Sequence, residues 1–125
     1  MATAILRFED CPELHARLAR VLGKPSACFV AGEPKKGKSG EQWASSLWTL
    51  ESPNTRRSVE KQLEWAAEIV REHQRFIRSL VRNSMKVTLH LACHGADGFT
   101  LFVMSPHLLE PFAKTGIPIE ICVMV

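Results

Sequence analysis

Apolar and polar positions divide the chain into short β-prone runs and longer segments with helical spacing. Strands are predicted where apolar and β-branched residues dominate a short run. The predicted strands are residues 3–8, 27–31, 46–51, 85–93, 99–104 and 117–125. Helices are predicted where apolar residues recur every three or four positions between a capping residue and a glycine or a turn. They lie between Asp10 and Gly23, from about 56 to 82, and between Ser105 and Gly116.

The order of these elements predicts the fold class. They follow one another as β-α-β-β-α-β-β-α-β, which indicates an α+β fold with a mostly antiparallel sheet and helices on one face. The first six elements have ferredoxin-like order, and the last three form an added β-α-β end. With 125 residues and 46% hydrophobic content, the chain suits a single domain over 1–125.

The longest predicted helix carries more apolar surface than one sheet can cover. At about 100° per residue, Val59, Leu63 and Val70 fall in one arc, while a second stripe lies beside it. The second stripe contains Trp65, Ile69 and Phe76. Either another helix of the chain or a second molecule must cover this stripe, so we predict that Trp65, Ile69 and Phe76 form a homodimer or partner interface.

The C-terminal segment contains the clearest helix start and stop signals of the chain. Ser105-Pro106 is a cap followed by proline at the first helical position, a leucine-rich helix follows, and Gly116 ends it. This ending resembles the bacterial domain-of-unknown-function 4279 family, whose members carry G-F-S-x-S-P-x-L-L-x-x-L and then G-x-x-x-x-x-x-I. The resemblance implies the layout of the chain but no activity. It also implies a variable, glycine-rich hairpin loop before a W-x-L strand, here 47–50, with Trp48 buried.

Residues 32–39 match the phosphate-loop pattern G-x-x-x-x-G-K-[ST] letter for letter. In a nucleotide site, Lys38 would contact the terminal phosphates and Ser39 would hold magnesium, and Lys35 and Lys36 add positive charge for an anion. A true phosphate loop opens a helix, whereas the residues after Ser39 favour an extended chain. No predicted strand ends in the aspartate that holds magnesium. We therefore predict a basic hairpin loop without nucleotide.

Two histidines and a cysteine near the end of one predicted strand suggest metal or nucleophile chemistry. His90 and His94 share a strand face but lie about 13 Å apart, too far to bind one zinc ion directly unless His94 folds back at the turn. Cys93 is next to His94, yet adjacent strand residues point to opposite faces. We therefore expect no metal site, no cofactor and an inert thiol.

Charge and cysteine usage limit the classes of partner and compartment. The net charge of +3 is low for a nucleic-acid binder, and no aromatic residue interleaves with the arginines of the long helix. The four cysteines show no C-x-x-C pairing, which favours reduced thiols and a cytoplasmic protein. No apolar run reaches the ~20 residues that cross a membrane.

The sequence favours a non-enzymatic binding or protein-interaction module, because it offers no paired carboxylates in apolar context and no nucleophile with a base. One alternative is an immunity protein that neutralises a partner toxin, although a cap for a nuclease would be strongly acidic. The other alternative is a nucleotide or phosphate binder that uses residues 32–39.

Overall fold

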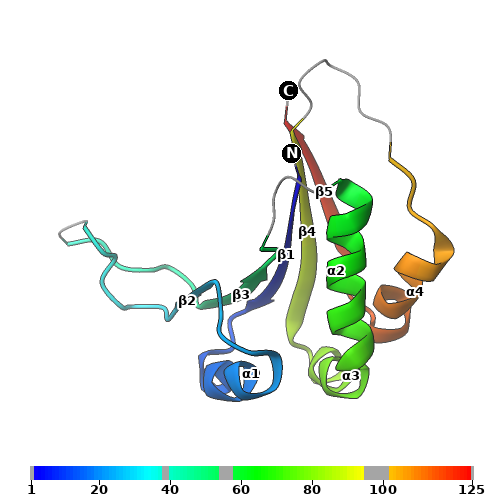
Figure 1. Ribbon diagram of the computed structural model, residues 1–125. Helices are drawn as coiled ribbons and strands as arrows, with labels where there is room; N and C mark the ends of the chain where they lie inside the picture. The colour runs from blue at the N-terminus through cyan, green and yellow to red at the C-terminus, as the bar shows by residue number, and fades with distance from the viewer. Residues whose placement is uncertain (1, 38–39, 54–57, 95–101, 125) are drawn as a thin grey trace.

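The computed structural model describes residues 2–37, 40–53, 58–94 and 102–124 (Figure 1). Its strands are β1 (Ala2–Glu9), β2 (Ala27–Phe29), β3 (Leu47–Glu51), β4 (Lys86–His94) and β5 (Ile119–Met124). Its helices are the 3-10 helix η1 (Pro12–Leu14), followed by α1 (His15–Leu22), α2 (Val59–Glu72), α3 (Gln74–Arg82) and α4 (Pro106–Thr115). The predicted α+β class is therefore confirmed.

The five strands form one sheet in the order β2-β3-β1-β4-β5. Neighbouring strands are antiparallel except β4 and β5, which are parallel. The segment β4-β1-β3-β2 has the split β-α-β arrangement of a ferredoxin-like core, in which each crossover skips one strand. Helix α4 then carries the chain from β4 to β5, since parallel neighbours need a crossover connection.

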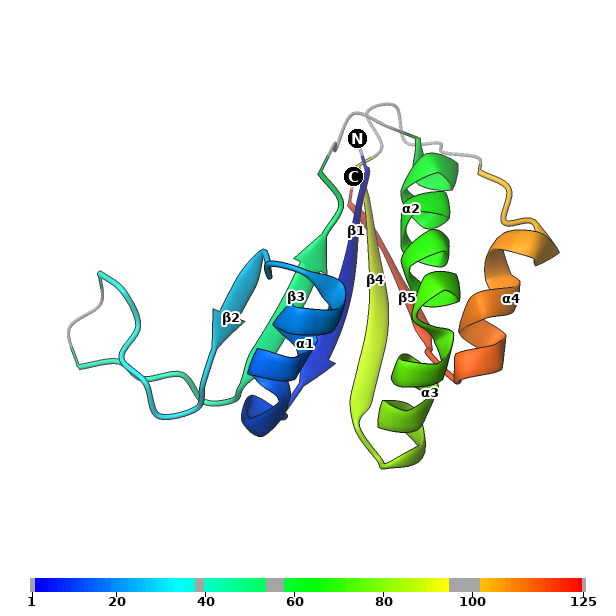
Figure 2. The ribbon, with the colours of Figure 1, turned by 60° about the horizontal axis from the view of Figure 1, so that its bottom comes forward.

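All the helices of the described chain lie on one side of the sheet (Figures 1 and 2). Along β1 the burial alternates, with Ala4, Leu6 and Phe8 fully buried toward the helices. Trp48 of β3 is also 0% exposed and packs edge-on against Phe8, with ring centroids 5.5 Å apart. The core thus lies between this face of the sheet and the helices.

The predicted single helix over 56–82 is two helices. α2 begins at Val59, where the Ser58 hydroxyl accepts a hydrogen bond from the Lys61 N–H at 3.2 Å. It ends at His73, whose φ of −111° and ψ of 29° are not helical, and α3 then begins at Gln74. No glycine or proline stands at this break. The break at His73 changes the direction of the chain, so that Ile77 and Leu80 of α3 are buried in the core.

The predicted strand at 99–104 is not supported where it can be judged. Residues 99–101 lie outside the described residues, and 102–104 form no strand. Among the described elements, the predicted β-α-β end is therefore an α-β end. The last predicted strand does form, as β5, but two of its apolar side chains are not buried: Ile121 is 46% exposed and Val123 is 54% exposed at the edge of the sheet.

Asp10 does not cap the first predicted helix. It adopts a positive φ of 54°, and its backbone N–H donates to the Ser46 carbonyl at 2.9 Å. Its carboxylate accepts from the Ser46 N–H at 3.4 Å. Asp10 therefore extends the contact between β1 and β3 instead of capping a helix.

Candidate functional site: the open face of the sheet

The face of the sheet opposite the helices carries no element of the described chain. Strand register places residues of neighbouring strands in rows across it. We call this surface the open face; its residues are Thr3, Ile5, Arg7, Glu9, Ala27, Phe29, Leu47, Thr49, Glu51, Lys86, Thr88, His90, Ala92, Glu120 and Cys122. Most of these side chains are partly exposed, as expected for an antiparallel sheet with one solvated face.

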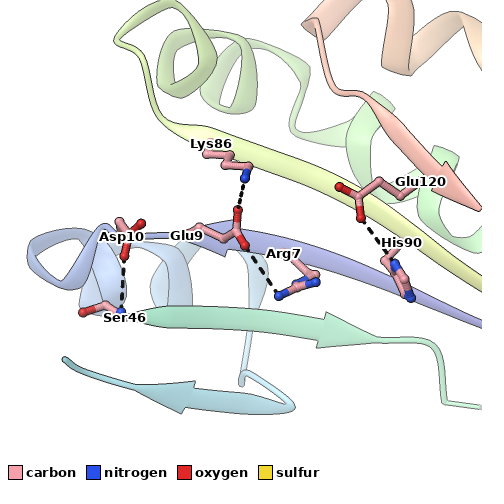
Figure 3. A network of polar contacts seen from close by, with 7 residues as sticks. All are labelled: Arg7, Glu9, Asp10, Ser46, Lys86, His90 and Glu120. Carbon is pink, nitrogen blue, oxygen red and sulfur yellow. Dashed lines mark hydrogen bonds and ion pairs between the residues drawn. The ribbon is translucent and has the colours of Figure 1, made fainter. Parts of the chain in front are cut away.

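Glu9 is the centre of a charged cluster on the open face (Figure 3). One carboxylate oxygen lies 3.5 Å from the Arg7 guanidinium and the other lies 3.2 Å from the Lys86 ammonium. The Glu9 side chain is only 23% exposed, whereas that of Lys86 is 70% exposed. Solvent screens such pairs, so each contributes about 0–1 kcal/mol to stability. The cluster therefore matters more for the charge pattern of this surface than for holding the fold together.

A second polar row crosses the open face at His90. Its Nδ1 atom lies 3.6 Å from a Glu120 carboxylate oxygen, which is an ion-pair contact only when the imidazole is protonated (Figure 3). In the neighbouring row, the buried Thr88 hydroxyl makes no hydrogen bond within the described chain, and the buried His90 Nδ1 atom has only this longer contact with Glu120. Unpaired polar atoms of this kind are uncommon in protein interiors. The middle of the open face therefore retains hydrogen-bonding capacity that the fold does not use.

The chain between β2 and β3 forms a hairpin that projects beyond the sheet (Figure 1). The backbone N–H of Gly32 donates to the Trp43 carbonyl at 2.9 Å, and the backbone N–H of Lys35 donates to the Glu41 carbonyl at 3.0 Å. These bonds confirm the predicted hairpin for the described part of residues 32–39. The phosphate-contacting residues Lys38 and Ser39 lie outside the described residues. No helix begins in 40–46, where a phosphate loop would require one.

The base of the hairpin joins the open face through two stacked aromatic rings. Phe29 and Trp43 lie with ring centroids 3.7 Å apart and planes 9° from parallel. The Lys35 ammonium lies 5.1 Å from the Trp43 ring centroid and 3.7 Å from a Glu41 carboxylate oxygen. A groove of about 580 Å³ runs beside the rings and is lined also by Lys36. Lys35 is thus held by an aromatic face and a carboxylate of its own hairpin, and both rings are partly exposed.

A thiol and an imidazole meet on the helix side of β2, a pair that the sequence analysis did not find. The Cys28 sulfur lies 3.2 Å from the His15 Nδ1 atom. Burial, and secondarily Glu33, raises the pKa of the Cys28 thiol, while burial lowers the pKa of His15. Both groups are therefore neutral near pH 7, whereas a cysteine nucleophile needs a lowered pKa. The contact packs α1 against β2, and only the crossover brings these two residues together.

The described structure does not bring the weak metal and nucleophile candidates His90, Cys93 and His94 together in one site. No group of three or more histidine, cysteine or acidic residues in the described chain is arranged to hold a metal ion. His90 contacts Glu120, while His94 is exposed at the end of β4. Cys93 is buried on the helix side, and this burial raises its pKa. A buried thiol with a raised pKa is poorly suited to act as a nucleophile.

The predicted interface residues Trp65, Ile69 and Phe76 are partly buried and packed against the core. α4 packs against the other flank of α2, where the Arg71 guanidinium donates a hydrogen bond to the His107 carbonyl at 3.2 Å, while Trp65 lines an open groove with Lys61, Glu64 and Glu68. The Arg17 guanidinium of α1 lies 5.1 Å from the Phe76 ring centroid. The three side chains are thus only partly covered within the described chain, and their role in an interface stays a prediction. The exposed large apolar residues of the described chain lie elsewhere, at Val103, Ile121, Val123 and Met124.

No protein-family model matches the chain, and neither a curated protein nor a solved structure matches it. The resemblance noted in the sequence thus stays an expectation. Among the helices that the structure describes, none is both long and apolar enough to cross a membrane.

Proposed function

We propose that the protein is a non-enzymatic interaction module that binds a partner protein on its open face. The observation that carries this proposal is the one-sided fold: every described helix covers the same face of the sheet, and no described element covers the opposite face. The partly exposed Phe29–Trp43 pair extends that surface at its β2 edge.

A solvated sheet face is not a binding site by itself, because many antiparallel sheets have one. Its composition supports the proposal. Ile5, Leu47 and Phe29 provide apolar contact area, and Arg7 and Trp43 belong to the residue types most enriched at energetic centres of interfaces.

The charges of the open face indicate the class of partner. Arg7 and Lys86 alternate with Glu9, Glu51 and Glu120, so both signs are present. A phosphate backbone is bound by surfaces of uniformly positive charge, whereas a protein surface can match mixed charges. A protein partner therefore fits better than a nucleic acid. An immunity protein would be a narrower case of the same proposal.

The experiment is quantitative affinity capture with three forms of the protein. An Arg7→Ser, Trp43→Ser variant removes one charge and one ring from the proposed surface. A Lys61→Ser variant removes a charge from α2, on the opposite side of the molecule, where the Lys61 side chain is 65% exposed. Circular dichroism establishes that each variant is folded.

We expect a protein that is enriched by the wild type and by Lys61→Ser but not by the open-face variant. Reconstitution with that purified protein should then reproduce the difference in affinity. Equal binding to all three forms would reject the open face as the binding surface. If no protein binds the wild type specifically, the interaction proposal itself fails.

A further inference from the structure

The sheet has two edges, and only one of them is long. β2 is a three-residue strand, and the hairpin continues from its end. β5 is six residues long, contains no proline, and has Glu120 as its one charged residue. Proteins usually protect such an edge with charges, proline, a bulge or a covering element. β5 has little of this protection.

The hydrogen-bonding groups along the outer side of β5 can be identified from its register. The Leu89 N–H donates to the Pro118 carbonyl at 3.0 Å, so Pro118 points toward β4. In a parallel pair, alternate residues of a strand bond to one neighbour and the residues between them point the other way. The N–H and C=O groups of Ile119, Ile121 and Val123 therefore point outward from the sheet.

The side chains of these same residues are apolar and increasingly exposed along the strand. They share a face with Leu89, Leu91 and Cys93, their partners in β4. Ile119 packs against the core, whereas Ile121 is 46% exposed and Val123 is 54% exposed. Within the described chain, the outer half of β5 thus combines main-chain groups that have no partner strand with apolar side chains.

We propose that β5 pairs antiparallel with β5 of a second copy of this chain, around a two-fold axis at Ile121 that is perpendicular to the sheet. Ile121 then lies opposite Ile121 of the second copy, and Ile119 lies opposite Val123. These are the residues with outward main-chain groups, so each pair exchanges two hydrogen bonds. The two sheets become one continuous sheet with the helices on the same side.

A second copy fits this edge because β5 is complementary to itself. A two-fold axis requires each residue to meet its symmetry partner, and in this register apolar residues meet apolar residues. Glu120 lies opposite Cys122, so the one charged residue of the strand does not face its own copy. The pairing leaves the open face free, so it is independent of the proposed partner-binding function.

Sedimentation equilibrium at high micromolar concentration tests the proposal with two disruptive variants and one control. Val123→Pro removes an outward N–H, leaves the bonds between β5 and β4 intact, and is placed on an edge strand, where proline is tolerated. Ile121→Lys places a charge on the axis without altering the backbone. Ala27→Lys makes a similar change on exposed β2 at the opposite edge.

We expect dimers for the wild type and Ala27→Lys, and a dissociation constant at least about tenfold higher for both β5 variants. If Val123→Pro fails to fold, Ile121→Lys alone decides. A monomeric wild type, or a dimer that Ile121→Lys leaves unchanged, would overturn the proposal.

Disulfide cross-linking tests the register, in a Cys28→Ser background that removes the exposed thiol of β2. With the axis at Ile121, residues 120 and 122 of opposite copies form a non-hydrogen-bonded pair with Cα atoms about 4.5 Å apart, close enough for a disulfide. Mild oxidation of Glu120→Cys should give a covalent dimer that Cys122→Ser abolishes. Cross-linking through Cys122 without the Glu120 change, or no cross-link in a dimeric protein, would reject this axis.

Discussion

Trp48 is the largest side chain that the described fold buries completely, and its truncation gives the sharpest test of the core. It packs edge-on against Phe8 with the ring planes 80° apart, between the sheet and the helices. Truncation of a buried tryptophan to alanine costs about 3–5 kcal/mol in lost burial and cavity formation. Loss of the aromatic pair adds about 0.5–1.5 kcal/mol.

The indole N–H of Trp48 offsets part of the stability that Trp48→Ala would lose. The indole N–H of Trp48 is buried without a hydrogen-bond partner in the described structure, and such a group destabilises a fold by about 1–3 kcal/mol. Trp48→Ala removes that penalty together with the ring, so we expect a net loss of about 3–4 kcal/mol. Domains of this size are stable by about 5–15 kcal/mol, so the variant should be close to unfolding.

Urea denaturation followed by far-ultraviolet circular dichroism measures the loss without relying on tryptophan fluorescence. Trp48→Phe keeps an aromatic ring against Phe8 and removes the N–H, so it should lose less than about 1.5 kcal/mol. Trp65→Ala is the matched control at a partly buried site and should cost less than Trp48→Ala. A loss below about 1 kcal/mol for Trp48→Ala would refute the burial argument.

Three other predictions concern the phosphate-loop match, the Cys28–His15 contact and the second apolar stripe of the long helix. Magnesium with a nucleotide should not raise the melting temperature of the protein. A nucleotide that did bind, at 100 times its dissociation constant, would add about 2.7 kcal/mol to the free energy of unfolding. A rise in melting temperature that Lys38→Ala abolishes would restore the nucleotide hypothesis. Cys28 should react with iodoacetamide at pH 7.5 more slowly than a free cysteine, because the pKa of its thiol is raised, and the reaction rate should increase with pH. If His15→Ala strongly lowers this rate, His15 activates the thiol and the expectation is wrong. A Trp65→Glu, Phe76→Glu variant should lose stability because both rings contact the core. A folded variant that changes only from dimer to monomer would instead support the predicted interface on that flank.

Local sequence patterns were sufficient to place most of the elements. The helix that begins after Ser105 and ends at Gly116 follows directly from its cap, its proline and its stop signal. Gly116 adopts a left-handed φ of 80°, and a Cβ atom there would come within 3.3 Å of Val81. The strand around Trp48 was similarly legible because its residues combine β-propensity with an aromatic ring that requires burial.

Other features depended on contacts between distant segments. The break at His73 has no local breaker, because it serves the packing of α3 against β4 and α4. Cys28 meets His15 only because the first crossover places α1 over β2. Ile121 and Val123 look like core residues in the sequence, but they lie on a strand at the edge of the described sheet.

The sequence by itself determined which residues favour a helix, a strand or a turn, and which side chains gain by leaving water. The tertiary structure decided which of those side chains are covered and by what. The physical reason is that propensity and periodicity act over one or two turns of chain, whereas burial depends on the neighbour that each face meets. A strand with the same apolar residues is core in the middle of this sheet and an interaction surface at its edge.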